Sequence, residues 1–120
     1  MKKHIMSFRH AWAGIVLAFS TQENYKIHFI LSILALLAGW FFKISYTELL
    51  ITLTFIFLGL TFEMLNTAVE ATCDAIDQTH REDIKIAKDV SAGAMLVFSF
   101  GAFITASIIF IPKIIVFFGH

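Results

Sequence analysis

An uncharged run of 23 residues, Val90 to Pro112, constrains the fold of this chain more than any other feature. As a helix it would be about 34 Å long, which exceeds the roughly 30 Å of hydrocarbon in a bilayer. The chain has 120 residues and 58% of them are hydrophobic, which is more apolar surface than one small soluble domain can bury. We therefore expect one membrane-embedded, all-α domain with a helical span over about 90–112.

Two shorter apolar stretches predict two more spans. Residues 27–42 are apolar except for His28 and Ser32, and aromatic residues at their far end are typical of a membrane interface. Residues 49–62 carry no charge but reach only about 21 Å, so this helix must continue past residue 62 to cross. We expect spans over about 27–46 and 48–73, a hydrophilic loop over about 74–89, and an end to the third span at Pro112 and Lys113.

The N-terminal segment predicts an amphipathic helix over about 5–20. Phe8, Trp12 and Phe19 share one face, while Arg9 and His10 lie on the other. We expect this helix to lie in the membrane interface, with a cleavable signal peptide as the alternative.

Most basic residues precede the first span or lie between the second and third. The positive-inside rule therefore places the N-terminus and the 74–89 loop in the cytoplasm.

Polar side chains appear abruptly where the second span should reach the cytoplasmic surface. Four of them share one helix face, at i, i+3, i+7 and i+11: Glu63, Asn66, Glu70 and Asp74. The topology brings Glu23, Lys88 and Asp89 to the same surface. Acidic groups at membrane depth are usually functional, and carboxylates with a lysine suit Mg²⁺ and phosphate. Metal, cation and base together favour phosphoryl transfer to the hydroxyl of a membrane lipid.

Other classes of function stay open at this point. Carboxylates in a span also serve proton- or ion-coupled proteins, although residues 49–62 offer no further ionisable group along a path. A non-catalytic membrane partner is a third possibility. The formal net charge is zero, which gives no reason to expect a nucleic-acid partner. Cys73 is the single cysteine, so no intramolecular disulfide can form.

Residues 63–74 read EMLNTAVEATCD, which resembles the E-x-x-N-[ST]-A-[IV]-E-x-x-x-D signature of the prokaryotic diacylglycerol kinase and undecaprenol kinase family. Ala87-Lys88-Asp89, followed by small residues at 92–94, is a second match, and Glu23 before the first span is a third. The resemblance covers nearly the whole chain. It implies a homotrimeric integral-membrane lipid kinase with a surface helix and three spans per subunit, which uses ATP and Mg²⁺.

The resemblance also implies a role for individual positions. Glu63 matches the catalytic base, Glu23 and Glu70 match the metal ligands, and Asn66 would orient the γ-phosphate or the base. The positions that match nucleotide contacts are Lys88, Asp89, His80, Arg81, Asp74 and Glu70. The candidate lipid-binding residues are Arg9, Trp12, His28 and Glu63. Arg9 can equally be an interfacial anchor, and a histidine such as His28 on an apolar helix is more often a structural residue.

One region bears on the choice of lipid. After Glu23 the chain reads Asn24-Tyr25-Lys26-Ile27-His28, which is similar to the E-N-x-x-I-H form of the Gram-positive branch that phosphorylates undecaprenol. Ile111-Pro112-Lys113 also resembles that branch. The arginine and acidic residue of the diacylglycerol branch are absent from this region. We therefore expect undecaprenol as the acceptor, with diacylglycerol as the alternative.

Overall fold

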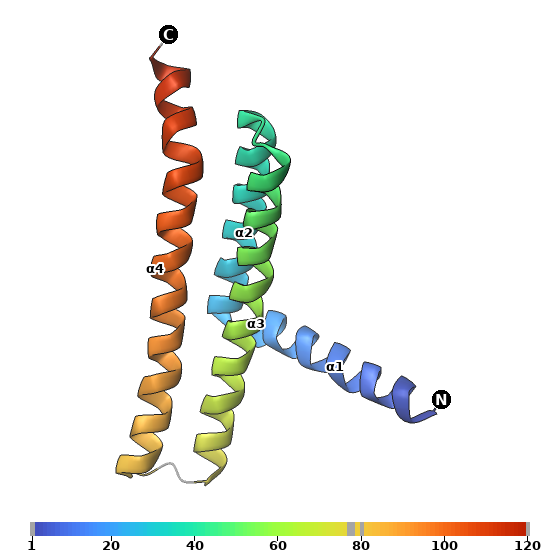
Figure 1. Cartoon of the computed structure of the whole chain (residues 1–120). Coiled ribbons are helices and arrows are strands. Elements are labelled where there is room, and N and C mark those ends of the chain that lie inside the picture. Colours follow the sequence, from blue (N-terminus) through green and yellow to red (C-terminus); the bar gives the residue numbers. More distant parts are fainter. Residues whose placement is uncertain (1, 77–78, 80, 120) are drawn as a thin grey trace.

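The computed structural model of the chain describes residues 2–76, 79 and 81–119, and within these ranges it forms four helices. They are α1 (Lys2–Thr21), α2 (Glu23–Phe42), α3 (Tyr46–Ile76) and α4 (Glu82–Phe118). In Figure 1, α2, α3 and α4 pack together, while α1 leaves the start of α2 and projects away from them. The last three helices are long and apolar enough to cross a membrane. The prediction of an all-helical fold with three helices able to span a membrane is therefore confirmed.

The helices differ from the predicted segments mainly at the end that carries the polar stripe. α3 runs to Ile76 and α4 begins at Glu82, so most of the predicted 74–89 loop is helical. The charged side chains of this region pair with one another, for example Lys85 with Asp89 at 2.6 Å across one helical turn. Such i,i+4 pairs support an exposed helix. As a result, α3 and α4 extend beyond the start of α2 (Figure 1).

The helix that carries the third predicted span does not end at Pro112. α4 continues through this proline to Phe118, although proline removes one backbone N–H from the helix. Contacts beyond the proline hold the last turns in place. Phe117 packs against Phe41 and Phe42 at ring-centroid distances of 5.5 and 6.1 Å, and Lys113 lies 2.8 Å from Glu48. Tertiary packing therefore overrides the local helix-breaking signal.

The turn between α2 and α3 is closed by backbone and side-chain caps. Lys43 adopts a left-handed conformation with φ 54°, and the backbone N–H of Ile44 donates to the carbonyl of Gly39. This is a Schellman ending, in which an apolar residue usually packs back on the helix. The side chain of Ile44 does so: a Cβ on Gly39 would lie 2.8 Å from its Cδ1 atom. Ser45 and Glu48 then cap α3 reciprocally, at 2.9 and 3.1 Å.

Helices α3 and α4 pack closely at Gly59 and Phe98, next to the polar stripe. The ring of Phe98 on α4 contacts Phe55 and Phe62 on α3, with centroids 6.0 and 5.9 Å apart. It also lies over Gly59, where an added Cβ would be 2.7 Å from the ring Cζ atom and 3.5 Å from Nδ1 of His28. Gly59 therefore permits the close approach of α4 and α2 to α3, one helical turn before Glu63.

We expect Gly59→Ala to destabilise the protein, because the new methyl group must displace the Phe98 ring. Overpacking of this kind typically lowers the free energy of unfolding by about 1–3 kcal/mol. Thermal unfolding in detergent measures the change. Gly101→Ala is the matched control, since its Cβ would meet only Phe55 at 3.8 Å, an ordinary contact distance. Equal unfolding temperatures for the two variants would contradict the packing argument.

Candidate functional site

Glu63 is a buried carboxylate in an otherwise apolar part of the helix bundle. Its relative exposure is 5%, and its Oε2 atom lies 3.7 Å from Nε2 of His28 on α2. This distance is too long for a hydrogen bond, but it is short enough for an ion pair when the imidazole is protonated. A buried carboxyl group beside an imidazole side chain is a candidate proton acceptor. His28, predicted as a substrate-binding candidate, thus lies directly at this position.

Asn66 and Glu70 are linked one turn further along α3. The Asn66 Nδ2 atom donates to Oε1 of Glu70 at 3.2 Å, as their i,i+4 spacing allows. The Oδ1 atom of Asn66 accepts a hydrogen bond of 2.7 Å from Ser91 Oγ on α4. Sequence reasoning did not select Ser91. Its position three residues after Lys88, on the same face of a helix, was the available signal.

Asp74 and Lys88 join the ends of α3 and α4. The Lys88 Nζ atom lies 2.5 Å from Oδ1 of Asp74, and both side chains are partly exposed. A lysine held at this position is a point charge that can bind a phosphate group. The structure therefore places Glu63, Asn66, Glu70 and Asp74 along one face of α3, with α4 supplying Ser91 and Lys88 opposite them.

The remaining predicted residues lie outside this row of contacts. Asp89 pairs with Lys85, and Arg81 pairs with Asp83 at 2.8 Å. Glu23 is exposed in the first turn of α2. The candidate lipid contacts Arg9 and Trp12 are exposed on α1, and His80 lies outside the described residues. Their predicted roles are not tested by these contacts.

The donor set near Glu70 fits a magnesium ion bound together with phosphate. Within residues 2–76, 79 and 81–119, no three His, Cys, Asp or Glu side chains come together to hold a metal. Mg²⁺ is usually held by only one or two carboxylates plus waters and substrate phosphates. Glu70 is exposed and accepts from Asn66 through one oxygen, which leaves the other available. Oxygen donors of this kind match the preference of a hard cation.

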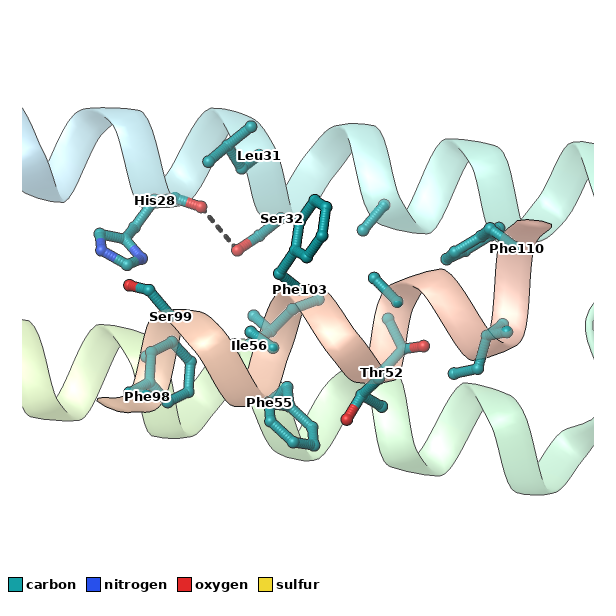
Figure 2. Close-up of a pocket in the computed structure, with 16 residues that line it drawn as sticks. His28, Leu31, Ser32, Thr52, Phe55, Ile56, Phe98, Ser99, Phe103 and Phe110 are labelled. Atoms are coloured by element: carbon teal, nitrogen blue, oxygen red, sulfur yellow. Dashed lines mark hydrogen bonds between the residues drawn. The ribbon is translucent and has the colours of Figure 1, made fainter. Parts of the chain in front are cut away.

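A cavity of about 420 Å³ opens between α2, α3 and α4. Figure 2 shows His28 at one end of it and Thr52 and Phe110 towards the other. Its walls are mostly apolar, and the hydroxyl groups of Ser32 and Thr52 are occupied by carbonyls of their own helices. The cavity thus suits a hydrocarbon chain, and through His28 it reaches the side of Glu63.

Comparisons with known proteins identify relatives of the chain. The family model described as prokaryotic diacylglycerol kinase matches residues 9–110. A diacylglycerol kinase from Synechocystis is 33% identical over 112 residues, which cover 92% of this chain and 64% of that protein. An undecaprenol kinase from Bacillus subtilis is 34% identical over 114 residues, which cover 95% of this chain and 93% of that protein. The chain thus spans slightly less than two thirds of the first relative and nearly all of the second.

Proposed function

The chain belongs to the prokaryotic diacylglycerol kinase family, a family of lipid kinases, and on this premise we propose that it transfers the γ-phosphate of ATP to the hydroxyl of a membrane lipid. The observation that carries the proposal is the position of Glu63. It is a buried carboxylate that lies between an apolar cavity and the row of polar side chains on α3. A lipid alcohol in the cavity and a nucleotide at the polar side chains would meet at Glu63.

Each side chain of the row has a proposed task. Glu63 accepts the proton of the lipid hydroxyl as that oxygen attacks the γ-phosphorus, while the bond from this phosphorus to the β,γ-bridging oxygen breaks and ADP leaves. Lys88 leaves its ion pair with Asp74 and binds phosphate oxygens of the nucleotide. Asn66 orients the γ-phosphate. Glu70 and Glu23 would hold Mg²⁺, which supplies charge neutralisation at the phosphates when bound. Because little covalent chemistry falls to the protein, its contribution is mainly to position charge.

The lipid itself is proposed to be undecaprenol, with diacylglycerol as the alternative. Residues 23–28 and 111–113 favour a polyprenol. The two relatives do not decide between the lipids, because one is named a diacylglycerol kinase and the other an undecaprenol kinase, and their identities to this chain are nearly equal. The apolar cavity beside His28 is compatible with either lipid, because a polyprenol and a diacylglycerol both combine a hydroxyl group with long hydrocarbon chains. The choice of lipid therefore rests on the sequence at residues 23–28 and 111–113.

The proposal includes the setting of the enzyme in a bacterial plasma membrane. Glu48 and Glu63 are 15 residues apart on α3, which corresponds to about 22 Å along the helix axis. Glu48 pairs with Lys113, and Glu63 lies beside His28. Most basic residues lie at the Glu63 end of the bundle, which supports a cytoplasmic position for the polar row.

Helix α1 exposes Phe8 and Trp12, which supports a position of this helix in the membrane interface. The exposed apolar surface of α2–α4 also leaves room for the homotrimer implied by the family.

Phosphate transfer from labelled ATP to the two lipids, measured side by side in mixed micelles, tests the proposal. We expect Mg²⁺-dependent product from both, with a kcat/KM for undecaprenol at least about tenfold higher, the factor that corresponds to 1.4 kcal/mol of transition-state binding. Chelation of Mg²⁺ should stop both reactions. The absence of any lipid product would contradict the kinase proposal, and a preference for diacylglycerol would contradict only the choice of lipid.

A further inference from the structure

The hydroxyl group of Ser91 behaves differently from other hydroxyl groups in the spans. Thr52, Thr54 and Thr67 each donate to the carbonyl four residues earlier in their own helix, which is the usual choice of a hydroxyl on an apolar helix. Ser91 instead donates from α4 to Oδ1 of Asn66 on α3, at 2.7 Å. This contact spans 25 positions in the sequence and joins two helices at the polar row.

Two partners together determine which way the Asn66 amide faces. A carboxylate can only accept, so Glu70 must face the Nδ2 atom of Asn66, which donates to it at 3.2 Å. The Oδ1 atom then faces Ser91, whose hydroxyl donates to it at 2.7 Å and holds it in place. A flipped amide would lose the bond to Glu70 and place its oxygen against a carboxylate. The result is a chain of two hydrogen bonds, in which Ser91 donates to Asn66 and Asn66 donates to Glu70.

From this geometry we propose that Ser91 is a positioning residue, which orients Asn66 and through it the carboxylate of Glu70 for the Mg²⁺-nucleotide. This inference rests on the proposed function, because Asn66 and Glu70 act on the nucleotide only if the protein is a kinase. Ser91 and Asn66 are both half-buried, so water competes with their bond less than at a fully exposed site. A supporting residue of this kind typically affects metal affinity by about 10- to 100-fold.

The decisive measurement is binding of a non-hydrolysable ATP analogue with Mg²⁺ to four proteins: wild type, Ser91→Ala, Asn66→Ala and the double variant. We expect Ser91→Ala to weaken binding about 10-fold in the wild-type background and to change nothing further when Asn66 is already alanine. Ser91→Thr, which keeps the hydroxyl, should restore most of the affinity. Ser107→Ala on the same helix is the control and should bind like the wild type.

Each outcome has one meaning. An equal loss from Ser91→Ala in both backgrounds would show a general structural role and would overturn the proposal, as would no loss in either. Failure of the wild type to bind nucleotide would instead overturn the proposed function. Binding rather than turnover is measured, so the test works even where Asn66→Ala abolishes catalysis.

A second measurement needs no nucleotide. The chain contains two asparagines, Asn24 and Asn66, so selective labelling gives two side-chain amide signals in an NMR spectrum. We expect the Asn66 amide to exchange with solvent more slowly than that of the exposed Asn24. Ser91→Ala should abolish this difference, and Ser91→Thr should retain it. Fast exchange at Asn66 in the wild type would remove the basis of the inference.

Discussion

Replacement of Glu63 by glutamine should reduce the turnover number by about 100- to 10,000-fold, which is the usual contribution of a general base. Glutamine has the shape of glutamate but cannot accept the proton of an attacking hydroxyl. Nucleotide binding should largely survive, because the contacts of Lys88, Asn66 and Glu70 do not involve the Glu63 side chain. Phosphate transfer and analogue binding, measured on the same preparation, separate the two effects.

The Glu63→Gln variant should also fold, and this makes its loss of activity interpretable. Glu63 is 5% exposed, and removal of a buried negative charge relieves a desolvation penalty. Its unfolding temperature should therefore be no lower than that of the wild type. The matched control is Glu48→Gln, which changes the same residue type near the opposite end of α3, where the carboxylate pairs with Lys113. Its turnover number per folded molecule should equal that of the wild type. Full activity in Glu63→Gln would exclude Glu63 as the base.

The helix that carries the site could be predicted from the sequence, because the spacing of its polar residues and the lack of charge before them are visible within one short segment. Glu63, Asn66 and Glu70 at helical spacing after an uncharged run could only share one face of a membrane helix. The three spans followed from the same local reasoning, and the structure agrees with them. Pro112 shows where local signals fail, because packing of Phe117 on the neighbouring helix holds the chain helical beyond it.

Contacts between helices could not be predicted in the same way. The bonds Ser91–Asn66 and Lys88–Asp74 depend on the register in which α4 packs against α3. That register is set by side chains such as Phe98 over Gly59, and a single sequence does not encode it in any short pattern. The proximity of His28 to Glu63 depends likewise on how α2 meets α3. A metal site shared by Glu23 and Glu70 stays a prediction, since no described contact joins them.

Replacement of Glu70 by glutamine should raise the Mg²⁺ concentration needed for nucleotide binding by about 100-fold or more. Loss of a ligand should exceed the 10- to 100-fold effect of removing a residue that merely supports one. Glutamine keeps an oxygen that can accept from Asn66 Nδ2, so the hydrogen bond of 3.2 Å between these residues can persist. The substitution thus removes negative charge from the proposed metal site while it preserves the neighbouring contact. Titration of Mg²⁺ at a fixed concentration of ATP analogue measures the shift.

The control for this experiment is Glu82→Gln, which changes an exposed carboxylate in the first turn of α4. Because Glu82 has no proposed role, its Mg²⁺ titration should coincide with that of the wild type. A Glu70→Gln variant that loses turnover but keeps the wild-type Mg²⁺ requirement would restrict Glu70 to orienting Asn66. If the Mg²⁺ concentration needed for nucleotide binding rises in Glu70→Gln but not in Glu82→Gln, this result would instead identify Glu70 as a metal ligand. A general electrostatic effect of losing one negative charge would change both variants alike.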